Sequence, residues 1–126
     1  MSTLKVNALQ DANGSNQSTI SEIEQGRAKA YCYYDGSGTY SILNSFNVSS
    51  LTDLAQGQAR VTWNSEFSDV NYCTVLGGSR EPYQNGTHGV LYVDAQSTTA
   101  VDLRACNDTA SVSRTDKNQV SVVCFQ

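Results

Sequence analysis

Few side chains in this sequence could catalyse a reaction. His88 is the only histidine, and it lies in the turn Asn85-Gly86-Thr87-His88-Gly89, which leads into a predicted strand. A nucleophile–histidine–acid triad needs a base that its neighbours orient, and the sequence gives His88 no such partner. The acidic residues are scattered, whereas glycoside hydrolysis needs two carboxylates at one bond. We therefore predict that the chain is not an enzyme and uses no cofactor, with a hydrolase that depends on His88 as the alternative.

The cysteines Cys32, Cys73, Cys106 and Cys124 stand far apart in the sequence. Zinc sites usually take ligands from close pairs such as CxxC, so we predict no metal site. Cysteine packs well as a small buried hydrophobe, which favours free thiols. Disulfides are the alternative if the protein works outside a cell. The sequence leaves both readings open.

Tyrosine is concentrated between residues 31 and 40. Side chains alternate across a strand, so Tyr31 and Tyr33 face opposite to Cys32 and Tyr34. At least one face of this strand therefore presents tyrosine outward. Exposed tyrosines become buried at protein interfaces or stack on sugar rings. The surface or receptor candidates are Tyr31, Tyr33, Tyr83 and His88.

The composition and periodicity favour an all-β domain. Charged residues make up only 16% of the chain, and polarity comes from Ser, Thr, Asn, Gln and Gly. From residue 28 onward apolar residues alternate with polar ones, and turn-forming segments separate the short runs. This pattern predicts one antiparallel β-sandwich or small barrel over 28–126. About seven strands are expected, near 28–34, 39–48, 57–65, 70–77, 88–94, 98–106 and 118–126, with 54–57 among the separating loops.

The first 27 residues differ from this pattern. For residues 1–17 we predict an arm, in which Leu4 and Val6 share one strand face and Asn13-Gly14 marks a turn. Residues 18–27 predict a short helix with a Thr19–Glu22 capping box and a stop at Gly26. A helix of about two turns is unstable alone, so we expect it to dock on something. The assembly or anchor candidates are Leu4, Val6, Leu9, Ile20 and Ile23.

The charge pattern excludes two classes of partner. The net charge is −4 and no basic cluster occurs, which argues against nucleic acid and anionic membranes. No apolar run of about 18 residues is present, so we predict no membrane insertion. Residues 1–10 lack the pattern of a secretory signal, so we expect release by another route, such as a particle freed by lysis.

Several segments resemble a known family in the same order along the chain. They are Ser2-Thr3-Leu4-Lys5-Val6-Asn7, residues 18–30, residues 45–53, Asp69-Val70-Asn71-Tyr72-Cys73 and the closing residues 120–125. Together they resemble short tail-fibre-like structural proteins of tailed phages of aquatic bacteria and cyanobacteria. Members of that family often carry Trp where Tyr31 stands, and the loop 77–86 is particular to this chain. None of these segments is a catalytic motif, so the resemblance implies a role without implying a reaction.

The resemblance implies a structural protein of the virion, assembled in the host cytoplasm, that serves assembly and host attachment. Its expected partners are other virion proteins, a host surface glycan and further copies of itself. A homotrimer is the first expectation and a dimer the second, because phage surface proteins commonly sit on symmetry axes. One alternative is a capsid decoration, or cement, protein that stabilises the phage head. A second alternative is a free carbohydrate-binding module.

Overall fold

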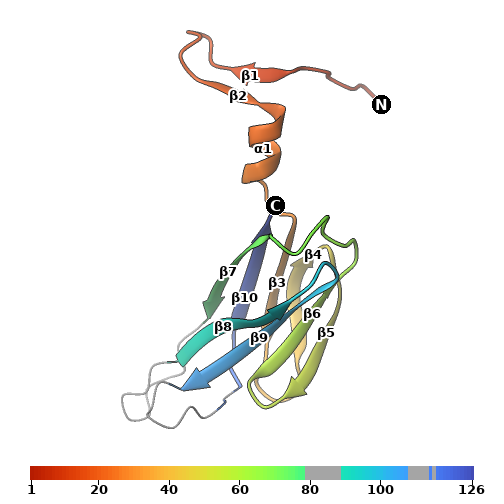
Figure 1. Cartoon of the computed structure of the whole chain (residues 1–126), viewed down its shortest axis with the longest axis vertical. Coiled ribbons are helices and arrows are strands. Elements are labelled where there is room, and N and C mark those ends of the chain that lie inside the picture. Colours follow the sequence, from red (N-terminus) through yellow and green to blue (C-terminus); the bar gives the residue numbers. More distant parts are fainter. Residues whose placement is uncertain (79–88, 108–113, 115) are drawn as a thin grey trace.

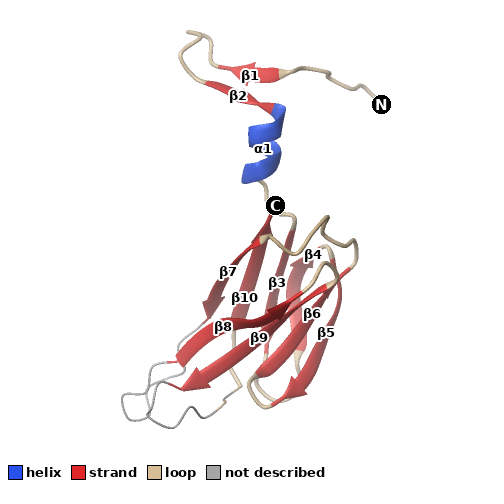
Figure 2. Cartoon of the chain, in the orientation of Figure 1, coloured by secondary structure: helices blue, strands red, loops and turns tan. Residues whose placement is uncertain are grey.

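A computed structural model shows a β-sandwich from which an N-terminal arm projects (Figure 1). The structure describes residues 1–78, 89–107, 114 and 116–126. Within these ranges it contains ten strands and one helix, and all of the strand pairs are antiparallel. The predicted all-β fold is therefore confirmed. Figure 2 shows the helix standing apart from the strands of the sandwich.

The arm comprises a short hairpin followed by the helix. Strands β1 (Ala8–Gln10) and β2 (Gln17–Thr19) pair with each other, and Gly14 takes a positive φ of 72° in the turn between them. Helix α1 (Ile20–Gly26) begins with the predicted capping box, in which the Thr19 and Glu22 side chains each bond the other's backbone N–H. No residue of α1 is buried. The strand begins at Ala8, so Leu4 and Val6 precede it and do not share a strand face as expected.

Two four-stranded sheets form the sandwich within the described residues. The first has the order β4-β3-β10-β7 and the second β5-β6-β9-β8. The strands of the first sheet are β3 (Ala30–Asp35), β4 (Ser41–Phe46), β7 (Cys73–Gly78) and β10 (Val120–Phe125). Those of the second are β5 (Val48–Ala55), β6 (Gln58–Trp63), β8 (Gly89–Gln96) and β9 (Ala100–Asn107).

The inward faces of the two sheets make the core. Alternate residues of β3, β6, β9 and β10 are buried, as strand periodicity requires. Trp63, Phe67 and Tyr72 form an aromatic cluster, in which the rings of Phe67 and Tyr72 stack at 4.1 Å and the ring of Trp63 meets Phe67 edge-on at 5.5 Å. The Tyr72 hydroxyl donates to the carbonyl of Ser97 at 2.9 Å, so its polar atom is satisfied inside the core.

The sequence prediction was wrong about the strand at 39–48. The structure divides that segment at Asn47 into β4 and β5, and β5 extends through the predicted loop at 54–57 as far as Ala55. Asn47 adopts a positive φ of 57°, so the chain turns within one residue and passes from the first sheet to the second. The side chain of Asn47 bonds the backbone of Ser65 through both its amide N and its O, at 2.9 Å and 2.7 Å. These bonds supply the turn that residue types alone did not indicate.

Helix α1 is too short to cross a bilayer, and the described residues contain no longer apolar helix that could do so.

Candidate interaction surface

Tyr31 lies at the centre of a row of apolar side chains that crosses the outer face of the first sheet. Its Cα partner on β4 is Phe46 and its partner on β10 is Val123, whose own partner on β7 is Val75. Directly paired residues project from the same face of a sheet. We call Phe46, Tyr31, Val123 and Val75 the aromatic row.

The aromatic row is only partly covered. Phe46 is 54% exposed and Val75 is 51% exposed, while Tyr31 and Val123 are half-buried. The rings of Tyr31 and Phe46 stack, with 6.1 Å between their centroids and 29° between their planes. The Tyr31 hydroxyl donates to Asn44 Oδ1 at 3.4 Å. The row therefore presents a flat apolar strip with a polar group at its margin.

The next row of the same face is polar and uncharged. Register places Tyr33 between Asn44 and Ser121, and Ser121 pairs with Gly77. The Ser121 hydroxyl donates to the carbonyl of Gly77 at 3.1 Å. Tyr31 and Tyr33 therefore share one outer face, as the alternation predicted.

Two other tyrosines of the same segment belong to the interior. Tyr34 is 4% exposed and stacks on Tyr40 at 6.0 Å. Burial raises the pKa of both phenols, and the hydrogen bond that Tyr40 donates to Asp116 adds to the rise for Tyr40. Both rings pack against the core, Tyr34 from β3 and Tyr40 from the residue before β4, so neither contributes to the outer face of the sheet.

The five arm candidates share substantial exposure. Leu4 is the most exposed of them, at 81%, and Ile23 the least, at 38%. Figure 1 shows the arm leaving the end of the sandwich at which the C-terminus lies. The remaining arm candidates are Val6, Leu9 and Ile20, which are 39%, 51% and 40% exposed. Tyr83 and His88, the other two surface candidates, lie outside the described residues.

The outer face of the second sheet, which we call the charged face, is built differently. Arg60 donates two hydrogen bonds to Asp102, from Nε at 2.7 Å and from Nη2 at 2.8 Å. Arg104 Nη2 donates to Asp94 at 2.7 Å, and the guanidinium lies 5.8 Å from the centre of the Tyr92 ring. Opposite charges on this face are therefore paired across neighbouring strands.

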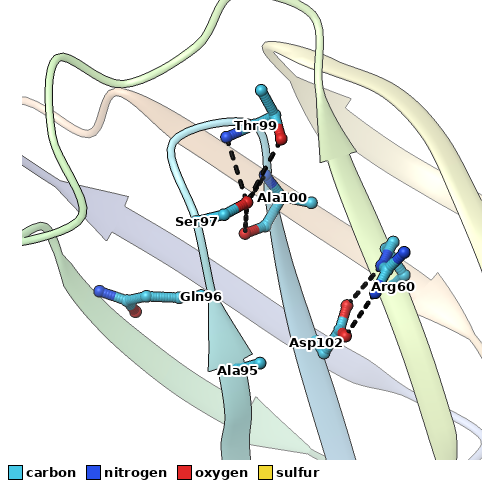
Figure 3. A pocket seen from close by; sticks show the side chains of 7 residues that line it. All are labelled: Arg60, Ala95, Gln96, Ser97, Thr99, Ala100 and Asp102. Carbon is cyan, nitrogen blue, oxygen red and sulfur yellow. Dashed lines mark hydrogen bonds and ion pairs between the residues drawn. The ribbon is translucent and has the colours of Figure 1, made fainter.

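A shallow hollow lies beside the Arg60–Asp102 pair (Figure 3). Ala95, Gln96, Ala100 and the turn residues Ser97 and Thr99 complete its lining. The Ser97 side-chain Oγ accepts hydrogen bonds from the backbone N–H groups of Thr99 and Ala100, at 3.3 Å and 3.1 Å. Both Asp102 oxygens are occupied by Arg60. The lining thus provides a stabilised turn and an ion pair, without a base held next to a nucleophile.

All four cysteines are free thiols in this structure. Cys32, Cys106 and Cys124 are buried, whereas Cys73 is exposed on the same face as the aromatic row. Burial raises the pKa of Cys32 and Cys124 to about 11, so both remain protonated at neutral pH. Among the described residues, no group of three or more His, Cys, Asp and Glu side chains could hold a metal ion.

Sequence reasoning identified Tyr31 and Tyr33 and missed the other members of the aromatic row. Val75 and Val123 alternate with the inward residues of their own strands. Their assignment to one continuous strip required the strand order β4-β3-β10-β7, which places β10 and β7 beside the β3–β4 pair although both lie far from it in sequence. Comparisons with known protein families, with curated proteins and with solved structures gave no match to this chain.

Proposed function

We propose that the chain is a structural protein on the exterior of a tailed phage particle, tail-fibre-like, and that it attaches through its N-terminal arm. The observation that carries the proposal is the arm itself. The five arm candidates stand outside the sandwich with between 38% and 81% of their surface exposed. Fixing the backbone of such a segment costs about 1–2 kcal/mol of conformational entropy per residue. Apolar side chains that stay in water do not offset this cost. The arm is therefore suited to become buried against a partner.

The resemblance to tail-fibre-like virion proteins supports the particle as the site of attachment. It runs through the arm, the helix and parts of the sandwich that include most of β5 and all of β10, in the same order. A small β-sandwich also gains from assembly, because a short chain buries a smaller fraction of its surface than a long one. Binding to neighbours then adds stability that the single chain lacks.

A capsid decoration protein is the second candidate, and the shape of the molecule favours it. A compact sandwich with one projecting arm can tether a head lattice as readily as it can join a tail, because the arm is the anchor in either case. The two candidates differ in copy number, which would be in the hundreds for decoration and near a dozen for a tail element.

Sugar binding by Tyr31 is a weaker candidate. Phe46 and Val123 flank Tyr31, and Val75 continues the row. Such a strip matches the apolar centre of a protein interface better than the polar margin that orients a sugar. Glycan attachment would then require other parts of the surface.

Immunogold electron microscopy of intact particles tests the proposal. We expect label on every particle, confined to the tail end for a tail element and spread over the head for decoration. Particles without label, beside a strongly labelled major capsid protein as the positive control, would refute a virion role. A variant that lacks residues 2–17 should keep its β circular dichroism and lose its place on the particle.

A further inference from the structure

Two groups of exposed apolar side chains stand out among the described residues. One is the aromatic row on the first sheet, and the other is the set of exposed arm residues. Large apolar patches on a soluble protein usually mark an interaction site. Because both occur on one chain, two copies of the chain can cover them for each other.

The root of the arm directs it away from its own sandwich. The Lys29 backbone N–H donates to the Cys124 carbonyl at 2.8 Å, which continues the β3–β10 pairing to the edge of the sandwich. The Lys29 ammonium also pairs with Glu24 of α1 at 2.7 Å. Asn47 Nδ2 donates to the Lys29 carbonyl at 3.2 Å. Three contacts on one residue thus fix the direction in which the helix leaves (Figure 1).

The acidic residues of the arm do not oppose contact with an uncharged face. Each of its three acids is hydrogen-bonded within the arm or at its root, and these bonds lower the three pKa values. The main donors are the Ser15 backbone for Asp11, the Thr19 backbone for Glu22 and the Lys29 side chain for Glu24. The arm can therefore approach the aromatic row without stripping water from an unpaired carboxylate.

We propose that the arm of one copy lies on the aromatic row of a second copy, and that the exchange is reciprocal in a two-fold dimer. The inference rests on the proposed function in one respect, that the arm is the assembly element. Leu4 and Val6 before the hairpin, Leu9 of β1, and Ile20 and Ile23 of the helix supply the apolar contacts to Phe46, Tyr31, Val123 and Val75. The second copy is the preferred occupant because the row contains no charge for a charged partner to recognise.

The area available supports a dimer over a ring of three. A large apolar side chain that is half exposed leaves on the order of 100 Å² to bury. The five arm side chains together with Phe46 and Val75 then bury roughly 700 Å² when one arm lies on one row. Two reciprocal contacts bury roughly 1,400 Å², which lies within the range of ~1,200–2,000 Å² for specific interfaces. In a ring of three, each pair of copies shares one contact, which falls below that range.

Light scattering on the full chain during size-exclusion chromatography measures the mass directly. We expect two copies for the natural chain and one for Val75→Ser, with the dissociation constant raised at least tenfold. The matched control is Val90→Ser. Val90 is 47% exposed on β8, an edge strand of the second sheet, and Val75 is 51% exposed on β7, an edge strand of the first. The control should remain a dimer, and so should a Leu54→Ser variant on β5.

The same assay separates this arrangement from others. The triple variant Leu4→Ser/Val6→Ser/Leu9→Ser should also give one copy, with unchanged β circular dichroism. Cys73, which is exposed beside the row, reports on coverage: alkylation should be slow in the dimer and fast in Val75→Ser. A mass of one or three copies for the natural chain would overturn the proposal. A dimer that survives Val75→Ser, or a monomer with slow Cys73 alkylation, would overturn it as well. Particle labelling is read independently of this mass, so either proposal can fail alone.

Discussion

The two outer faces of the sandwich are built on the same core and differ in chemistry. The charged face pairs Arg60 with Asp102 and Arg104 with Asp94 across neighbouring strands. The aromatic row presents Phe46 and Val75 at about half exposure, with no charged residue in register beside them. The charged side chains of one face are paired with each other, whereas the apolar side chains of the other gain by being covered. Of two exposed sheet faces, the one with uncovered apolar side chains is therefore the better candidate for a contact surface.

The comparison assumes that one core supports both faces, and Trp63→Ala would break it most severely. Trp63 is 5% exposed and contacts both Phe67 and Tyr72. Truncating a buried Trp costs about 3–5 kcal/mol, which is a large part of the stability of a small domain. Chemical denaturation should show one transition at much lower denaturant. Two separate transitions would mean that the sheets unfold independently.

The turn at Asn47 fixes the two sheets to each other, so it tests their relative placement. Asn47→Ala loses hydrogen bonds to Ser65 and Lys29 and puts alanine at a positive φ. We expect a loss of about 2 kcal/mol in unfolding free energy. Asn47→Gly tolerates the backbone angle and separates the two causes, and should lose less. Equal losses would assign the whole effect to the side-chain bonds.

Alkaline pH should reveal the thiols that lie beneath the aromatic row. Burial raises the pKa of Cys32 and Cys124 from 9.0 to about 11, so the folded state holds these protons more tightly than the unfolded state. Their contribution is complete below about pH 9 and is lost as the pH rises to about 11. The denaturation midpoint should change little between pH 7 and pH 9 and should be lower at pH 11. The fall should be smaller in Cys32→Ala/Cys124→Ala and unchanged in Cys73→Ala.

The smallest effect on stability is expected at the row itself. Phe46 is 54% exposed, so Phe46→Ser removes little buried area, and we expect a change within about 0.5 kcal/mol at monomer concentrations. A variant that is as stable as the natural chain yet no longer assembles would assign Phe46 to the contact surface and not to the core. A loss of several kcal/mol would show that Phe46 belongs to the core.

The prediction succeeded where local rules act. The Thr19–Glu22 capping box needs only four consecutive residues, and the alternation of Tyr31, Cys32, Tyr33 and Tyr34 follows from strand geometry. It failed at Asn47, because a single Asn between two strand-like segments is a weak local signal for a one-residue turn. Tyr83 and His88 stay predictions, as do the virion role and the partners.

The sequence alone predicted the all-β class, the cap of the helix and that Tyr31 and Tyr33 share one face of their strand. Each of these depends on the spacing of residues within one element. Only the tertiary structure decided that Val75, Val123 and Phe46 join Tyr31, and that the opposite face is closed by ion pairs. The order of strands in a sheet depends on contacts between distant segments, and the period of two along each strand is the same for every order.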